Sequence, residues 1–547
     1  MASTPEAVTT SQTTSVGSAG AVEQYDAIVI GAGVAGLYAV YRLREAGFNV
    51  KGLEDAEGVG GTWYWNRYPG CRFDSESETY GYTFSKELQQ EWSWKEHYSG
   101  QPENEKYLNF VADKFDLKRH YRFNSHVVAA HYDEDANRWE LRLETGERFR
   151  AQFVVAAVGI LSARYVPPFK GIDDFKGQSF HTSRWPKEKI DFTGKRVAVI
   201  GTGATAVQLI PLVAKECGHL TVFQRTPNYC APLRNGLVSE ETQQRWKANY
   251  DVIVRKCRES PTGFPYDFDR RKALEVSKEE RYKLYEELWA LPGFRKWLGN
   301  FRDIMVDLKA NEDFAEFVRN KIRARVKDPK VAEKLVPKDH PFGAKRIPLE
   351  TEYYEAYNRD NVLLVDVRET PIERITPKGI QTSDREYEFD IIIYATGFDA
   401  ITGPLTRMDI RGEGGRQLKE HWANGPRTVV GLTTAGFPNF FIASNTAFCN
   451  YTVCAEKVVE WITDTISHVR RNNFSRIVPR PEAEEAWVQH VNEVGQRTLL
   501  GATKSWFVGG NIPGKANAYL LYGNTAPAYR AKLAEIVAKG YEGFVLR

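Results

Sequence analysis

The sequence predicts an α/β fold made of two Rossmann-like dinucleotide-binding domains with a helical insertion. Three observations carry this prediction. A strand, a glycine-rich turn, a helix and a second strand follow one another from residue 25, and the same order recurs from residue 195. Residues 235–335 instead combine many charges with aromatic side chains at helical spacing. Apolar stretches typical of buried strands return afterwards, at residues 360–366 and 389–394.

Length and charge limit the classes of partner. The chain has 547 residues, enough for two or three domains, and 42% of them are hydrophobic, so a normal core can form. Lysine and arginine total 74 against 71 aspartate and glutamate residues, which gives no reason to expect nucleic acid or an anionic membrane surface. No apolar stretch approaches the roughly 18 residues of a membrane-spanning helix. We therefore expect neither nucleic acid nor a membrane as partner.

The first 24 residues are rich in Ser, Thr and Ala, and no Lys or Arg occurs before Arg42. A secretory signal needs a basic start and an apolar block, and a transit peptide needs arginines, so neither is indicated. We expect residues 1–24 to be a disordered tail and the protein to be cytoplasmic. The six cysteines form no C-x-x-C pair, which indicates scattered reduced thiols and not a disulfide framework.

The first glycine-rich turn has the features of a site for a nucleotide with free ribose hydroxyls. Its strand, residues 25–30, leads into Gly31, Gly33 and Gly36, which permit a tight turn and let backbone N–H groups approach a pyrophosphate at a helix N-terminus. The second strand of the unit is closed by Glu54, 23 residues after Gly31. A carboxylate there accepts hydrogen bonds from ribose hydroxyls and repels a 2′-phosphate, which suits FAD.

The second turn favours a different nucleotide. Residues 195–200 form the strand, and four residues are expected at the pyrophosphate: Thr202, Gly203, Ala204 and Thr205. The next strand ends with Arg225 and Thr226 in place of a carboxylate. A guanidinium at this position can pair with a 2′-phosphate, which suits NADPH. Taken alone, Arg225 is equally compatible with a solvated surface charge.

These patterns predict two domains that are each interrupted and resumed. The insertion contains Ser277 and Glu280 in the spacing of a helix-capping box. The expected segments are a tail at 1–24, an FAD-binding part at 25–150, an NADP-binding part at 151–234, the helical insertion at 235–335, a second NADP-binding part at 336–385, and a second FAD-binding part with a mobile C-terminal loop at 386–547.

Two longer motifs indicate which chemistry the nucleotides serve. Residues 175–186, FKGQSFHTSRWP, resemble the F-x-G-x-x-x-H-T-x-x-W-P signature of class I Baeyer–Villiger monooxygenases over twelve residues. Residues 60–74, GGTWYWNRYPGCRFD, resemble the G-G-x-W-x-x-x-x-Y-P-G-x-x-x-D segment that this family has at the flavin. The resemblance extends from about Tyr25 to the C-terminus and is to the cyclohexanone, phenylacetone and steroid monooxygenase branch.

The resemblance implies an enzyme that uses FAD, NADPH and O₂ to convert a ketone to an ester or lactone through a C4a-peroxyflavin. It implies that Arg346 is the catalytic cation, that Asp74 orients it, and that Lys345 reaches the NADP phosphate. Trp506 is similar to the tryptophan of a mobile loop that closes over NADP. His181 would lie near the nicotinamide nucleotide, and no residue at ligand spacing makes it a metal ligand. Further cofactor contacts are assigned to Thr62, Trp63, Tyr80 and Val127.

One segment departs from the family pattern. After residues 437–439 the family has a Gly-Pro-containing stretch against the flavin and substrate, whereas this chain reads FFIASNTAFCN over residues 440–450 and is shorter there. A wider pocket and bulky or polycyclic ketones are therefore expected, unless Phe448 or Tyr451 fills the space. Three alternatives remain open: an S- or N-oxygenating flavin monooxygenase, an NADPH oxidase, and a non-enzymatic NADP-binding regulator. The protein is expected to be a monomer or a homodimer.

Overall fold

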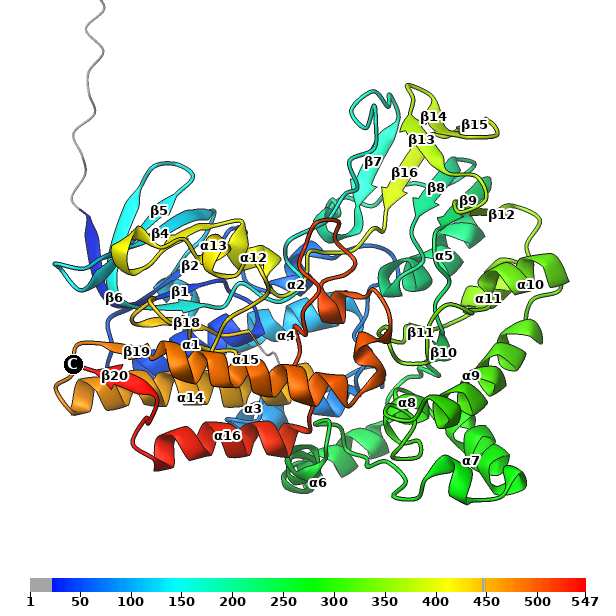
Figure 1. The fold of residues 1–547 in the computed structure, drawn as a ribbon. Coiled ribbons are helices and arrows are strands. Elements are labelled where there is room, and N and C mark those ends of the chain that lie inside the picture. The colour runs from blue at the N-terminus through cyan, green and yellow to red at the C-terminus, as the bar shows by residue number, and fades with distance from the viewer. Residues whose placement is uncertain (1–21, 445–446, 448) are drawn as a thin grey trace, which may run out of the picture.

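Two sheets stand side by side in the computed structural model, which describes residues 22–444, 447 and 449–547 (Figure 1). The larger sheet has the order β17-β4-β5-β6-β1-β2-β3, and β18 pairs with β6. Its strands are β1 (Glu23–Ile30), β2 (Val50–Leu53), β3 (Tyr121–Arg122), β4 (Val127–Asp133), β5 (Arg138–Leu143), β6 (Arg148–Ala156), β17 (Asp409–Arg411) and β18 (Phe440–Ile442). Parallel pairing of β2, β1 and β6 places their carboxyl ends, and the first glycine turn, at one edge.

The smaller sheet is parallel in the order β12-β9-β8-β16-β7 and carries the second glycine turn. Its strands are β7 (Gln178–His181), β8 (Arg196–Ile200), β9 (His219–Gln224), β12 (Val362–Asp366) and β16 (Ile391–Tyr394). Small additional pairings involve β10 (Ala231–Pro232) with β11 (Leu349–Glu350), β13 (Ile372–Ile375) with β14 (Gly379–Thr382) and β15 (Glu386–Glu388), and β19 (Ile477–Pro479) with β20 (Phe544–Leu546).

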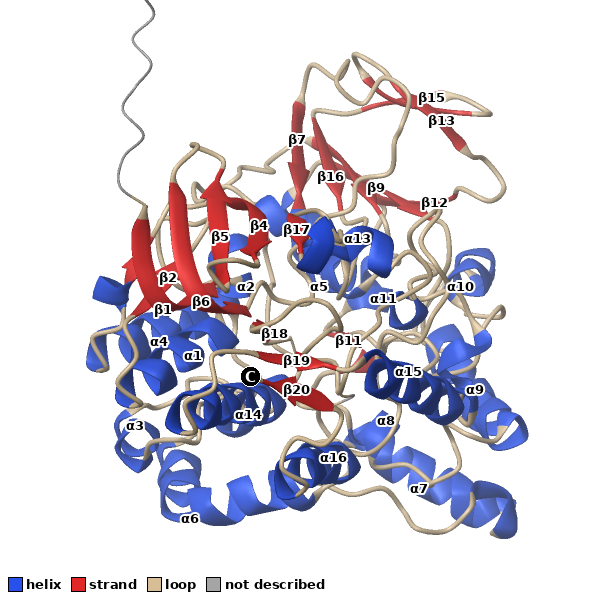
Figure 2. Ribbon diagram, turned by 60° about the vertical axis from the view of Figure 1, so that its left-hand side comes forward, coloured by secondary structure: helices blue, strands red, loops and turns tan. Residues whose placement is uncertain are grey.

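Helices cover the outer faces of both sheets. At the larger sheet, α1 (Val34–Glu45) packs on β1 and β2, and α12 (Gly403–Thr406) and α13 (Leu418–His421) pack on β17. Further helices lie outside these: α14 (Tyr451–Arg471) packs on α1, α16 (Ala526–Ala538) packs on α14, and α4 (Gln101–Lys114) packs on α2 (Thr62–Trp65) (Figure 2). The short α3 (Lys86–Glu91) contacts the insertion, α15 (Pro481–Gln496) follows β19, and α5 (Ala204–Glu216) and α11 (Tyr353–Ala356) accompany the smaller sheet. The insertion consists of α6 (Glu240–Glu259), α7 (Lys278–Ala290), α8 (Arg295–Leu298), α9 (Leu308–Arg323) and α10 (Pro329–Leu335). Ser277 caps α7 by accepting from the Glu280 N–H at 3.2 Å, as the capping pattern predicts.

The strand pairings correct three expected boundaries. Glu23 and Gln24 belong to β1 because they pair with β6, so the tail expected at 1–24 is too long by these two residues; residues 1–21 lie outside the described part. Residues 151–156 complete β6 in the FAD-side sheet, so the boundary at 150 cuts a strand. Likewise β16 pairs with β8 and β7, so residues 391–394 belong to the NADP-side sheet and not to the segment 386–547. Strand pairing decides membership here, and apolar sequence alone does not reveal it.

Buried apolar strands explain why both sheets form. Ile28, Val29, Ala198 and Val199 are fully buried, as parallel strands covered on both faces require. Among the described residues, no helix is long and apolar enough to cross a membrane.

Candidate active site between the two sheets

A cavity of about 1280 Å³ lies between the sheets and is bordered by both glycine turns. Apart from Gly36 and His181, it is lined by every residue that the sequence singles out for catalysis or cofactor binding. His181 is buried at the end of β7, and its neighbours Ser183 and Arg184 reach the cavity wall. Gly36 has a different role, because a Cβ there would lie 1.9 Å from the Gly31 carbonyl oxygen. Its missing side chain lets α1 pack closely on β1, which is the packing that the third glycine of such a turn provides.

The first turn has the geometry needed to hold FAD. Gly31 has φ +108°, and a Cβ there would lie 2.5 Å from the Ala157 carbonyl oxygen, so only glycine fits. The Glu54 carboxylate is 5% exposed and accepts from the N–H groups of Ala32 and of Ala56, the latter at 2.9 Å. Burial raises the Glu54 pKa, while these two N–H groups lower it. The carboxylate thus borders the cavity where ribose hydroxyls of FAD would lie.

Aromatic residues extend this side of the cavity. The Trp63 indole donates to the Tyr80 hydroxyl, and the two rings meet edge to face with centroids 5.9 Å apart. Both side chains are buried, and both line the cavity together with Thr62 and Val127. This apolar wall fits the flavin ring system, whose flat faces need aromatic or aliphatic contacts.

The second glycine turn makes the same close approach to a carbonyl oxygen as the first, but cations and not a carboxylate lie at the end of the following strand. Gly201 has φ +112°, and a Cβ there would lie 2.4 Å from the Ala395 carbonyl oxygen. Lys345 lies near Arg225 in the cavity wall: burial lowers the Lys345 pKa, the Asp339 carboxylate opposes this, and Arg225 lowers it further. Asp339 pairs with His340. Two adjacent cations at the end of β9 fit the 2′-phosphate of NADP.

Arg346 and Asp74 meet in the cavity wall, as the resemblance implies. The Arg346 Nη1 and Asp74 Oδ2 atoms are 2.7 Å apart; the arginine side chain is 30% exposed and the aspartate 2%. The N–H is not aligned on that oxygen, so the contact is an ion pair without a well-directed hydrogen bond. The Arg346 guanidinium also lies 5.3 Å from the Phe294 ring centroid. A fixed cation is thus presented to the space between the two nucleotide turns.

Comparison with known proteins identifies the family. A family model described as flavin-binding monooxygenase-like matches residues 25–230. The 2-oxo-Delta(3)-4,5,5-trimethylcyclopentenylacetyl-CoA monooxygenase of Pseudomonas putida is 48% identical, covering 95% of this chain and 98% of that protein. A Baeyer–Villiger monooxygenase of Pseudooceanicola batsensis is 44% identical, covering 95% and 96%. The chain belongs to the Baeyer–Villiger monooxygenases. The signature of residues 175–186 is therefore correctly interpreted.

A solved structure supports the cofactors of this Baeyer–Villiger monooxygenase. The crystal structure titled as OTEMO in complex with FAD and NADP superposes with a TM-score of 0.93 at 47% identity, covering 96% of this chain and 100% of that one. The enzyme accordingly uses FAD and NADP(H), and the non-enzymatic alternative is not supported. A phenazine N-monooxygenase of Lysobacter antibioticus is also 42% identical over 95% of the chain, so N-oxygenation occurs among the relatives.

Gln208 is a site residue that the sequence did not reveal. It lies in α5, one turn after Ala204, and reaches across to the FAD side. Its amide nitrogen is 3.2 Å from Asp74 Oδ1, and its amide oxygen accepts from the Tyr68 hydroxyl at 2.8 Å. The helical spacing from Ala204 was the available signal, because residues four apart share a helix face. The insertion also contributes lining residues that no motif indicates: Phe264, Phe294, Trp297 and Leu298.

The altered segment adjoins the same cavity. Ala447, Cys449, Asn450 and Tyr451 line it, whereas Phe448 lies outside the described residues. The expectation of six free thiols is wrong at this point, because Cys449 and Cys454 form a disulfide with their Cα atoms 6.5 Å apart. These cysteines precede and follow the Asn450 cap of α14 at positions where side chains meet in a hydrophobic staple. That spacing of five is not a cysteine motif, so the sequence did not suggest the pair.

The Trp506 loop is attached to the segment that leads from the smaller sheet to α12 of the larger one. Trp506 lines the cavity, and the loop containing it stands between the two sheets in Figure 1. The Lys515 ammonium contacts Asp399 Oδ1 at 2.6 Å and the Ala400 carbonyl oxygen at 2.9 Å, and the Asn511 amide donates to the Phe398 carbonyl oxygen at 2.9 Å. These bonds hold the loop against the segment that connects β16 to α12.

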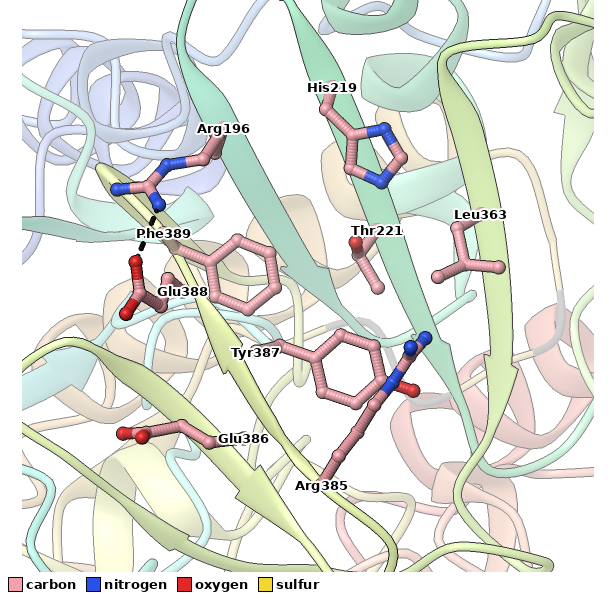
Figure 3. A pocket seen from close by; sticks show the side chains of 9 residues that line it. All are labelled: Arg196, His219, Thr221, Leu363, Arg385, Glu386, Tyr387, Glu388 and Phe389. Atoms are coloured by element: carbon pink, nitrogen blue, oxygen red, sulfur yellow. Dashed lines mark hydrogen bonds and ion pairs between the residues drawn. The ribbon is translucent and has the colours of Figure 1, made fainter.

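A second hollow, about 330 Å³, lies at the opposite edge of the smaller sheet (Figure 3). Arg196 and His219 are the first residues of β8 and β9, so this hollow is at the amino ends of the strands, whereas nucleotides bind at the carboxyl ends. Arg196 is already paired with Glu388 and Asp390. We assign no role to this hollow.

We predict that Arg225→Ala raises KM for NADPH about tenfold or more, because a charge-assisted contact contributes roughly 1.5–3 kcal/mol. KM for NADH should stay near the wild-type value, since that coenzyme has no 2′-phosphate. Steady-state kinetics with both coenzymes measure the effect. Equal losses with NADPH and NADH would contradict the assignment of Arg225.

We predict that Lys515→Ala loosens the Trp506 loop and increases release of H₂O₂ per NADPH about fivefold, the factor that corresponds to roughly 1 kcal/mol. The resemblance implies that this loop closes over the site and excludes water, and the Lys515–Asp399 ion pair would favour the closed position. Peroxide and ester yields measure the effect, with Lys532→Ala on exposed α16 as control. Unchanged coupling in Lys515→Ala would show that the contact does not govern closure.

Proposed function

We propose that this Baeyer–Villiger monooxygenase oxidises an apolar, bulky ketone and that Arg346 is its catalytic cation, with Asp74 as the residue that orients it. The observation that carries the proposal is the ion pair at 2.7 Å in the wall of the cavity between the two nucleotide turns. Bound FAD supplies the redox chemistry and the activation of O₂. The chain has to place the ketone, stabilise charge and exclude water.

Arg346 suits the charge-stabilising task. Oxygen insertion collects negative charge on the oxygen of the ketone, and a cation fixed beforehand stabilises that charge with little reorganisation. Asp74 is 2% exposed, so its negative charge acts at short range and holds the guanidinium in place. Gln208 in turn contacts Asp74 from the NADP side. An S- or N-oxygenating enzyme has no such oxyanion to stabilise, which favours the ketone reaction over that alternative.

The lining of the cavity supports the class of ketone. Phe264, Phe294, Trp297 and Leu298 form an apolar wall beside Arg346. Such a wall removes apolar substrate surface from water, at about 25 cal/mol per Å², and so favours larger ketones. The monomeric or homodimeric state and the cytoplasmic location remain predictions.

We predict that Arg346→Ala lowers ester or lactone formation about 10²–10³-fold, the usual effect of removing one stabiliser of an oxyanion. FAD binding should persist, because Gly31 and Glu54 lie on another part of the cavity. Product yield, NADPH consumption and flavin content are measured, with Arg385→Ala in the second hollow as control. Near wild-type ester formation by Arg346→Ala would refute the assigned role.

We predict that bulky or polycyclic ketones give higher kcat/KM than cyclobutanone or cyclohexanone. The physical reason is the shortened segment at 440–450 together with the aromatic wall. A panel of linear, monocyclic and polycyclic ketones, with product analysis and a heteroaromatic amine as the N-oxygenation arm, measures the preference. A clear preference for the small cyclic ketones would contradict the proposed substrate class.

A further inference from the structure

Lys296 carries a buried amine that does not line the cavity of the oxygenation site. It lies in α8 and is 1% exposed. Its Nζ donates to the carbonyl oxygen of Leu291 and, at 3.2 Å, to that of Gly293. Both acceptors are neutral backbone groups, although buried lysines are ordinarily paired with carboxylates. The side chain therefore ties together the turn that joins α7 to α8.

That turn is held from several sides. Gly293 has φ +69°, and a Cβ there would lie 2.4 Å from the Tyr98 hydroxyl and 3.0 Å from Glu76 Oε1. Its N–H donates to the Leu233 carbonyl oxygen at 3.1 Å. The turn thus fits closely against the FAD side of the molecule, and Lys296 closes it from within.

Phe294 directly follows the turn in sequence, so the position of the turn sets the position of this ring in the active site. The ring lines the cavity and lies 5.3 Å from the Arg346 guanidinium. It also contacts the rings of Phe264 and Trp297, with centroids 5.7 and 5.9 Å away. A cation over an aromatic face is attracted by the ring, so a displaced Phe294 changes both the shape of the wall and the support of Arg346.

We propose that Lys296 is a positioning residue of the oxygenation site: its buried amine holds the turn Leu291–Gly293 closed and thereby seats Phe294 against Arg346. The proposal rests on the proposed role of Arg346. It assigns a function to the insertion, which fixes one side of the catalytic cation while Asp74 fixes the other.

The protonation of Lys296 agrees with this geometry. Burial lowers the pKa of its amine to about 7; Arg234 and Arg295 lower it as well, and Glu350 and Glu76 oppose them. A neutral amine has two N–H groups, which matches the two carbonyl acceptors, whereas the protonated form has a third N–H to satisfy. The turn is therefore bridged in either form, and the neutral form fits without an unsatisfied donor.

The first test compares Lys296→Met with Lys309→Met, a substitution of an exposed lysine at the start of α9. Lys296→Met should bind FAD and keep KM for NADPH within about twofold, but lower kcat/KM for the ketone about tenfold and raise the H₂O₂ fraction, since small misplacements at a site cost rate steeply. Lys309→Met should resemble wild type. Wild-type ketone kinetics and coupling in FAD-loaded Lys296→Met would overturn the proposal.

A double-mutant cycle with Phe294→Leu separates positioning from general weakening. If Lys296 acts through Phe294, Lys296→Met should change ketone kinetics much less in the Phe294→Leu background than in wild type. Full additivity of the two substitutions in ketone kinetics would overturn the proposal. Wild-type coupling of NADPH use to ester formation in Phe294→Leu would overturn it as well. The Phe294→Leu variant stays informative if Lys296→Met does not fold. Arg346→Ala is measured in parallel: if it still forms ester, the proposed catalytic cation fails, whereas the cycle still reports whether Lys296 positions Phe294.

Stability against pH provides a readout of the buried amine itself. The folded pKa is about 7, and the unfolded value is about 10.4, so between these values only the unfolded chain binds the proton. The wild-type free energy of unfolding should therefore gain a contribution as pH rises through this window, and Lys296→Met should lack it. From pH 7 to pH 9 the melting temperature of wild type should therefore rise relative to that of Lys296→Met. A difference independent of pH would contradict the buried neutral amine.

Discussion

The Asp74 carboxylate joins the parts of the molecule on which oxygenation depends. It belongs to the FAD side, contacts Gln208 of the NADP side through one oxygen, and pairs with Arg346 through the other. At 2% exposure it cannot rely on water for solvation, so both partners are needed to offset its burial. A shift of α5 relative to the FAD sheet would therefore disturb the orientation of Arg346, the proposed catalytic cation. The position of the NADP-side helix and the proposed stabilisation of charge thus depend on the same carboxylate.

Local sequence predicts the two nucleotide turns well because their physics is local. Gly31 and Gly201 need positive φ and a close approach to a carbonyl oxygen, requirements that only glycine meets. The distinction between Glu54 and Arg225 is likewise readable, since it depends on the residue at the end of one strand. The wider resemblance to the family added Arg346 and Asp74, which lie far apart in sequence and meet only in the fold.

Long-range pairing explains what the sequence did not predict. The boundaries at 150 and 385 were misplaced because β6 and β16 are equally apolar and only their neighbours decide to which sheet they belong. Phe294 and Trp297 resemble ordinary core aromatics of a helical region, and no local feature directs them to the cavity. Lys296 reads as a surface lysine, because it directly follows Arg295 and a pair of basic residues gives no sign of burial. The disulfide partners are visible only once the start of α14 is known.

The anchoring of the C-terminal loop that contains Trp506 bears on how water is kept from the site. Lys515 and Asn511 bind residues 398–400, which lie in the connection between β16 of the NADP-side sheet and α12. The side chains of Lys515 and Asp399 are 15% and 16% exposed, so the pair is screened less than a surface ion pair. The loop is therefore fastened to the connection between the two sheets, which is itself held to residues 160–163 after β6 by the N–H groups of Asp399 and Ile401. The proposed closure of Trp506 over the coenzyme would accordingly depend on both halves of the molecule, because its anchor lies on the segment that joins them.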